Sequence, residues 1–171
     1  MDRNNKVSRF FRHLLSGPWR VRRLFSDAAM RNIETEIQHN ETSHTGEIRF
    51  AVEAALHPLE LMAGKTPRER AIELFAAMNV WDTEANNGVL IFLLLADHRI
   101  EVVADRGLTG KVGAEQWRGV CQQMEERLRA GEAEAAVIAG VEAVSGLLAL
   151  HFPQDGSMRD EDELPNRPHV F

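Results

Sequence analysis

The sequence has little of what several classes of protein require. A single cysteine, Cys121, excludes an intramolecular disulfide and a cysteine-rich zinc site, which is typical of a reducing compartment. The longest apolar run, 88–96, is shorter than the about 20 residues that a membrane-spanning helix needs. Arg9, Arg12 and His13 interrupt every apolar segment near the basic start, so no secretory signal is predicted. We therefore expect a cytoplasmic protein.

A complete catalytic set is also missing. We find no nucleophile beside a general base, no glycine-rich loop of the kind that holds phosphate, and no helical zinc motif. Cys121 and Arg127 have the spacing of a thiol phosphatase, but the residues between them are helical, acidic and free of glycine. We interpret Cys121 as a structural residue on an apolar helix stripe. His39, His44 and His98 are interpreted as surface residues.

What is present favours one globular domain. The 171 residues are 44% hydrophobic and 27% charged, and they contain no internal repeat. Residues 1–25 hold seven Lys or Arg against one Asp, a net charge of +6, so the rest of the chain carries −12. Such an acidic body argues against nucleic acid as a partner, because clustered positive charge must displace the counterions of the phosphates.

The basic segment 1–25 begins with a predicted amphipathic helix. One stripe holds Val7, Phe10, Phe11, Leu14 and Leu15, and the opposite side is polar. Two roles fit this helix: packing on the domain, or lying on an anionic lipid surface, where each Lys or Arg adds about 1 kcal/mol. The candidate membrane residues are Phe10, Phe11, Arg12, Leu14 and Trp19.

The rest of the chain predicts a three-layer α/β/α sandwich. The order is α-β-α-β-β-α-α, and a strand that is apolar on both faces requires helices on both sides of its sheet. The elements are a helix from Ser26 to about His44, a strand at 47–53, a helix from the capping box at Thr66 to about Asn79, a buried strand at 88–95, a returning strand, a helix ending before Gly131 and a helix at about 132–150.

Side-chain periodicity predicts the buried faces. In strand 47–53 one face is buried and the other solvated. The helix after Thr66 is predicted to turn Ile72, Phe75 and Ala76 inward. The inward residues of the last two helices are Trp117, Val120, Cys121, Met124 and Leu128, and then Ala133, Val137, Val141, Val144 and Leu148.

Two finer details concern the hairpin and the C-terminal segment. A two-residue turn at Asp97 and His98 would set Leu90 opposite Asp105. Residues 153–171 have too little apolar content to offset the conformational entropy that ordering would cost, which predicts a flexible polar tail. The predicted organisation is therefore a basic segment (1–25), a domain (26–152) and a tail (153–171).

Three stretches of this chain resemble the TPM domain family. They are NNGVLIFLLLADHRIEVVADRGL at 86–108, RERAIELFAAMNVWD at 68–82 and AGEAEAAVIAGVEAVSGLL at 130–148, and the resemblance covers about residues 26–151. The family is named after a thylakoid lumen protein, a photosystem II repair protein and an acetylcholine-receptor modulator. The resemblance implies a single α/β/α domain, frequently tied to membranes, with bacterial members often beside LemA-type membrane proteins. It also implies calcium binding and weak acid phosphatase activity, claimed for some plant members.

The chain departs from the family pattern where a metal site is implied. The family has Asp-Asn-Gly and Gly-Tyr-Gly-Leu-Glu where this chain has Asn86-Asn87-Gly88 and 105–109, so two carboxylates are missing, and the family's Asn-Asp-Tyr-Ala-Gly motif is replaced at 19–25. Hard cations take roughly six to eight oxygens, and charged ligands tune their affinity. At most a weakly bound Ca²⁺ or Mg²⁺ is expected, and ordinary turn chemistry is the alternative. The candidate ligands are Asp82, Glu84, Asn86, Asn87 and Asp105.

Three functional hypotheses follow. The first is a non-catalytic TPM-domain binding module at the cytoplasmic membrane face, with a LemA-like partner. The second is a metal-assisted phosphate-ester hydrolase in which Asp82, Glu84 and Asp105 surround a cation that activates water. The third is a homo-oligomer in which the basic segment pairs with the acidic tail.

Overall fold

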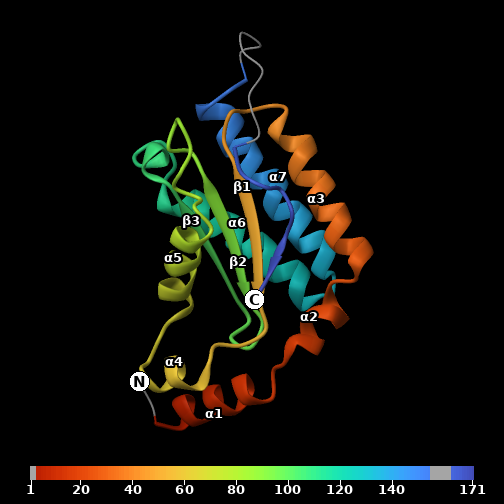
Figure 1. The fold of residues 1–171 in the computed structure, drawn as a ribbon, viewed down its shortest axis with the longest axis vertical. Helices are drawn as coiled ribbons and strands as arrows, with labels where there is room; N and C mark the ends of the chain where they lie inside the picture. Colours follow the sequence, from red (N-terminus) through yellow and green to blue (C-terminus); the bar gives the residue numbers. More distant parts are fainter. Residues whose placement is uncertain (1–2, 155–162) are drawn as a thin grey trace.

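A mixed four-stranded sheet organises the protein, whose computed structural model describes residues 3–154 and 163–171. The strands are β1 (Ile48–Glu53), β2 (Val89–Leu94), β3 (Arg99–Ala104) and β4 (His169–Val170), in the order β3-β2-β1-β4. β1 runs parallel to β2 and β4, whereas β3 is antiparallel to β2. Helices cover both faces of the sheet (Figure 1), which confirms the predicted α/β sandwich.

The larger core lies on one face of the sheet. It packs against α2 (Pro18–Leu24), α3 (Asp27–Glu41), α6 (Ala114–Arg129) and α7 (Ala133–His151). Ser26 caps α3 as predicted, because its Oγ accepts a hydrogen bond from the N–H of Ala29 at 3.1 Å. The five residues that periodicity places on the inner side of α7 are all buried, which confirms that prediction.

α7 has the length and apolar composition of a membrane-spanning helix, yet it is the core helix of this domain. Half of its 18-residue apolar window is buried inside the protein, where it packs on α3 and α6. At Gly140 it approaches α6 so closely that an added methyl group would overlap the side chain of Met124. The apolar surface of α7 is therefore used for packing.

α5 (Pro67–Ala77) covers the other face, and its buried side differs from the prediction. The capping box at Thr66 and Glu69 forms as expected. The helix buries Ala71, Leu74 and Phe75, whereas Ile72 is 50% exposed. Ala76 is also exposed. The prediction was wrong because two overlapping stripes of similar apolar content both contain Phe75, and periodicity alone does not decide between Ile72 and Leu74.

The hairpin between β2 and β3 has a four-residue turn, so the predicted register was wrong by two residues. Leu94 pairs with Arg99 and Leu90 with Val103. The N–H groups of Leu95 and Ala96 donate to the carbonyl oxygens of Glu53, the last residue of β1, and of Ala54, at 3.0 Å each, so these residues extend the pairing with that strand. They consequently do not pair with β3.

β1 is buried on both faces, which corrects the expectation of a solvated face. Glu47, Arg49 and Glu53 are 3%, 6% and 7% exposed. The reason is that β1 is an inner strand of a sheet whose two faces are both covered by helices.

The C-terminal residues form part of the fold, unlike the flexible tail that was predicted for 153–171. β4 pairs with β1, and the N–H of Phe171 donates to the carbonyl of Val52 at 3.0 Å. Leu164 and Asn166 are each 6% exposed. The edge of β1 offers unpaired backbone N–H and C=O groups. The C-terminal segment can therefore be ordered by backbone hydrogen bonds, with little apolar content of its own. Residues 155–162 of the predicted tail lie outside the described residues.

Three helices gather where β1 and β2 finish. α1 (Arg3–Leu14), α2 and α4 (Pro58–Met62) lie at this end, as does the turn at 95–98 (Figure 1). We call this region the hairpin end. The 3₁₀ helix η1 (Arg106–Leu108) follows β3 and so lies at the opposite end of the sheet.

Candidate functional site

Asp97, in the β2–β3 turn, holds α1 against the domain. Nε and Nη2 of Arg9 donate to its two carboxylate oxygens at 2.8–3.0 Å, and Nη2 also donates to the carbonyl of Lys65 at 2.9 Å. Nε2 of His13 lies 3.0 Å from Oδ1 of Asp97. On the other side of the ring, Nδ1 of His13 accepts a hydrogen bond from the N–H of Leu56 at 3.0 Å.

These contacts determine the proton position and the charge within the group of Arg9, His13 and Asp97, which we call the anchor. Because Nδ1 of His13 accepts an N–H, a ring proton lies on Nε2 and faces Asp97. Burial by itself raises the pKa of Asp97, but hydrogen bonds from His13 and Arg9 outweigh burial and hold that pKa well below its usual range. The result is an ionised carboxylate, 7% exposed, that binds the polar side of α1.

The apolar side of α1 consequently faces solvent. Its outward face consists of Val7, Phe11, Leu14 and Leu15, which are 54%, 55%, 61% and 73% exposed. Trp19, after α1, is 56% exposed, while Phe10 is half-buried. A surface helix normally buries its apolar stripe and shows its polar side to water. This helix instead leaves most of its apolar stripe in water, although Ser8 and Arg12 are exposed as well, and so it presents an apolar surface.

α4 extends this exposed apolar surface beside α1. Leu59 and Met62 of α4 are 69% and 77% exposed. A cavity of about 220 Å³ lies between the two helices and is lined by Phe10, Leu14, Leu56 and Leu61, among others.

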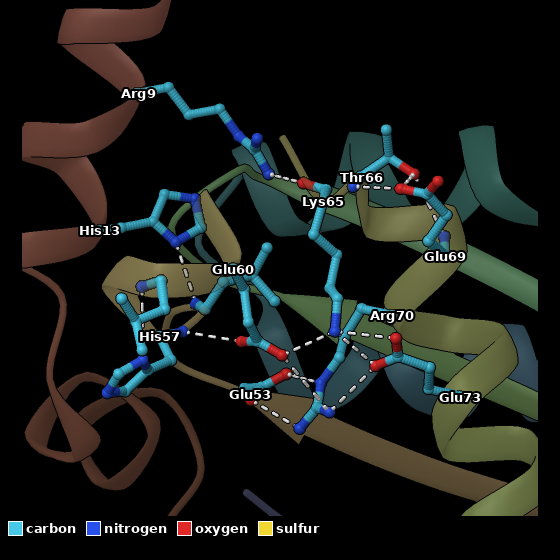
Figure 2. A network of polar contacts seen from close by, with 12 residues as sticks. Arg9, His13, Glu53, His57, Glu60, Lys65, Thr66, Glu69, Arg70 and Glu73 are labelled. Atoms are coloured by element: carbon cyan, nitrogen blue, oxygen red, sulfur yellow. Dashed lines mark hydrogen bonds and ion pairs between the residues drawn. The ribbon is translucent and has the colours of Figure 1, made fainter. Parts of the chain in front are cut away.

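A charged network fixes α4 in this position. Figure 2 shows Lys65 and Arg70 between the carboxylates of Glu53, Glu60 and Glu73. Both oxygens of Glu53, at the end of β1, accept from Arg70 at 2.8 and 3.0 Å, and Lys65 contacts Glu60 at 2.8 Å. Burial raises the pKa of Glu60, but the hydrogen bond from Lys65 and further contacts bring its pKa below the usual value. The network thus joins β1, α4 and α5 through ionised groups.

The five predicted metal ligands lie at the opposite end of the sheet, in different environments. Asp82 and Glu84 are exposed, and Oδ1 of Asn86 accepts from Arg106 at 2.8 Å. Asn87 is fully buried, and its Nδ2 donates to the carbonyl of Thr45 at 3.0 Å.

These residues do not make a set that fits a tightly bound hard cation. Within 3–154 and 163–171, no three His, Cys, Asp or Glu side chains gather closely enough to hold a metal ion. Arg106 places a positive charge beside Asn86. Oδ1 of Asn87 and Oδ2 of Asp105 are nevertheless buried, with no hydrogen-bond partner among the described residues. A weak metal site here stays a prediction.

The glycines of the signature stretch have a packing role. A methyl group on Gly88 would overlap the carbonyl oxygen of Val80, and one on Gly107 would overlap the carbonyls of Ala85 and Asn86. Gly107 also donates its N–H to Asn86 at 2.8 Å. These positions need glycine because two backbone segments meet there.

The cysteine and histidines lie in different environments. Burial and the nearby Glu101 and Glu125 raise the pKa of Cys121, so the thiol stays protonated and is a poor nucleophile. His39 is exposed, as predicted. The prediction for His44 was wrong, since its side chain is fully buried. His98 is exposed and has a left-handed backbone, with φ of 51°.

Sequence reasoning missed the anchor of Arg9, His13 and Asp97. The available signal was that Arg9 and His13 are four apart and therefore share the polar side of the predicted helix. Their common partner is 88 residues from Arg9, and no local pattern identifies it.

Comparison with known proteins agrees with the fold described above. The family model of the TPM domain matches residues 21–147. The NMR structure of the BA42 protein from the psychrophilic bacterium Bizionia argentinensis is similar, with a TM-score of 0.74, 24% identity, and coverage of 86% of this chain and 95% of that one. The solution structure of the N-terminal domain of a P. gingivalis protein gives a TM-score of 0.56 and 23% identity, covering 73% and 76%. The comparison with curated proteins gives no match.

Proposed function

Because the chain belongs to the TPM domain family, we propose that it is a non-catalytic binding module whose hairpin end lies on an anionic membrane surface. The proposed location is the cytoplasmic face, and the proposed protein partner is a LemA-like membrane protein. The partner rests on the family resemblance, and the cytoplasmic side is the one expected from the single cysteine.

The reversed orientation of α1 is the observation that carries the membrane proposal. Its polar side is held by Asp97, while Phe11, Leu14 and Leu15 are more than half exposed. Transferring apolar surface out of water contributes about 25 cal/mol per Å². A lipid headgroup boundary accepts such a helix along its length.

Charge in the same segment supports an anionic surface. The side chain of Arg12 is 46% exposed, and Arg22 and Arg23 of α2 are also exposed. Each such residue near an anionic leaflet contributes about 1 kcal/mol. The whole chain has a net charge of −6, so attraction to lipid must come from this local group.

Sedimentation with vesicles tests the proposal. The wild-type protein is expected to bind vesicles rich in phosphatidylglycerol more tightly than phosphatidylcholine vesicles, and less tightly as salt rises. The double variant Phe11→Ser/Leu15→Ser is expected to lose roughly 30-fold in partitioning, because two half-exposed large side chains contribute about 1 kcal/mol each.

A matched control distinguishes binding through this surface from nonspecific adsorption by exposed apolar side chains. The variant Trp81→Ser/Leu150→Ser removes one aromatic and one leucine that are 51% and 70% exposed elsewhere. It is expected to bind vesicles like the wild type. Equal binding by both double variants, or no preference for anionic lipid, would contradict the proposal.

The second candidate function is the metal-assisted phosphate-ester hydrolase. The observation in its favour is the pair of buried oxygens on Asn87 and Asp105 that have no hydrogen-bond partner among the described residues. Hydrolysis of a generic phosphate ester that chelators abolish, and that Asp105→Ala removes, would establish it. Turnover that persists in Asp105→Ala would point to a contaminating phosphatase.

A further inference from the structure

A second cavity at the hairpin end has an apolar floor. It measures about 210 Å³ and lies between α2, the end of β2 with its turn, and the C-terminal half of α6. Leu93 and Leu95, at 1% and 4% exposed, form the sheet side, and Leu128 closes it from α6. Sites for drug-sized ligands occupy roughly 300–1,000 Å³. This cavity therefore fits a short apolar chain and is too small for a whole lipid.

The rim of this cavity is basic. Arg20, His98 and Arg129 line it together with one acidic residue, Glu125. Arg129 donates to Glu125 at 2.7 Å, so these two charges compensate each other. The guanidinium of Arg20 donates to the hydroxyl of Ser16 at 2.7 Å, and it has no carboxylate partner in the part of the chain that the structure describes. One permanent positive charge on the rim is thus left for a ligand.

The surroundings of His98 agree with a positive potential at the rim. Burial lowers the pKa of His98, and the charges of Arg20 and Arg12 lower it further. His98 lies in the turn that also carries Asp97 and lines the cavity, and its backbone is left-handed, which is rare for a residue with a side chain.

We propose that this cavity binds an amphipathic anion, with a short unbranched chain over Leu93, Leu95 and Leu128 and a carboxylate or phosphate head at Arg20 and His98. The floor disfavours a purely ionic ligand, because such a ligand leaves the leucines in contact with water. The charge of Arg20 disfavours a cation. A neutral apolar ligand gains nothing from Arg20.

Octanoate tests this site, because it carries one carboxylate on an unbranched chain. The measurement is an amide and imidazole chemical-shift titration of the labelled full-length protein with octanoate, octanol and acetate. Octanoate is expected to shift Leu95, His98 and Leu128 in a saturable way, and octanol and acetate are expected to bind at least roughly tenfold more weakly, since each lacks one half of the recognition.

Substitution at the rim makes the test specific. Arg20→Gln is expected to weaken octanoate binding at least roughly tenfold, because a charge-assisted contact is lost. Arg31→Gln is the matched control: it removes the same charge from an exposed position on α3, which does not line the cavity, and it is expected to bind octanoate like the wild type. The amide spectrum of each variant also reports whether it folds.

Two results would overturn the proposal. One is the absence of saturable shifts around the cavity with millimolar octanoate, and the other is equal binding by Arg20→Gln and Arg31→Gln. A third arm distinguishes the source of the anion. If Arg20→Gln reduces octanoate binding alone, the ligand is a soluble amphiphile. If it also reduces binding to phosphatidylglycerol vesicles more than Arg31→Gln does, the cavity holds part of a membrane lipid. Failure of vesicle binding in the wild type leaves the octanoate result standing.

Discussion

At the scale of single residues, Asp97 determines which side of α1 meets the domain. It is the one acidic partner of Arg9, Arg12 and His13 among the ion pairs of the described residues. A carboxylate in this position fixes the polar side of the helix inward. The exposure of the apolar side follows from that choice.

Removing Asp97 is expected to destabilise the protein. Asp97→Ala leaves Arg9 and the buried His13 without their acceptor, so the free energy of unfolding is expected to fall by about 2–3 kcal/mol. Because the folded pKa of Asp97 is depressed, its contribution is full above the unfolded pKa of about 3.9 and is lost as pH falls toward the folded value. Urea unfolding measures the change, and Asp82→Ala, an exposed control, should change stability little. Equal stability of the two variants would show that α1 is not anchored by Asp97.

His44 is expected to make stability depend on pH near neutrality. Burial lowers its pKa in the folded state, so below about pH 6.5 the unfolded chain takes up a proton that the folded chain does not. Stability is therefore full above that pH and falls on acidification, by about 1–2 kcal/mol from this residue between pH 7 and 5. Urea unfolding of His44→Leu at both pH values should show a smaller decrease than the wild type. An identical decrease would mean that His44 does not titrate differently on folding.

Residue-level patterns predicted burial well where one stripe is unambiguous. α7 offers a single apolar side, and all five predicted inward residues are buried. In α5 two stripes share Phe75, and the choice between Ile72 and Leu74 depends on the sheet beneath. His44 was assigned to the surface because its burial comes from long-range packing, including its pairing with Pro153.

At the scale of elements, α1 shows the limit of periodicity. Its hydrophobic stripe predicts a helix, and a helix forms. The same stripe is compatible with either side facing the domain, because the spacing contains no information about Asp97, 88 residues from Arg9. The hypothesis of an apolar surface at Phe11 and Leu14 could be stated from sequence, but the polar anchor required the structure.

β4 was missed for a related reason. Two strand residues in a polar segment carry no detectable alternation, and their order comes from the open edge of β1. The predicted hairpin register was wrong for a similar reason, because Leu95 and Ala96 continue the pairing with β1 and do not pair with β3.

Deleting residues 168–171 is expected to expose the edge of β1. The loss of β4, and of Phe171 stacked by Arg70 at 5.6 Å, should lower the free energy of unfolding by about 1–2 kcal/mol and promote self-association. Urea unfolding and light scattering at several protein concentrations measure both effects. His169→Ala, which keeps the backbone pairing, serves as the control. A truncated chain that stays monomeric and equally stable would show that β4 adds nothing to the fold.

At the scale of the whole molecule, the two ends of the sheet differ in chemistry. The hairpin end has the exposed apolar residues of α1 and α4, a basic segment and both cavities. The opposite end carries Asn86, Asn87 and Asp105 in loops that glycines hold close together. The parallel strands β1 and β2 finish at the hairpin end, which is where open α/β sheets usually bind their ligands.

The measurement that tests the membrane account most directly is paramagnetic broadening of amide signals by spin-labelled lipid in anionic bicelles. The account predicts that broadening is strongest at Phe11, Leu15 and Trp19, and that residues 82–88 and 105–110 are unaffected because they lie at the opposite end of the sheet. Broadening centred on 82–88 and 105–110, or spread evenly over the surface, would contradict the claim that the hairpin end is the membrane-binding surface.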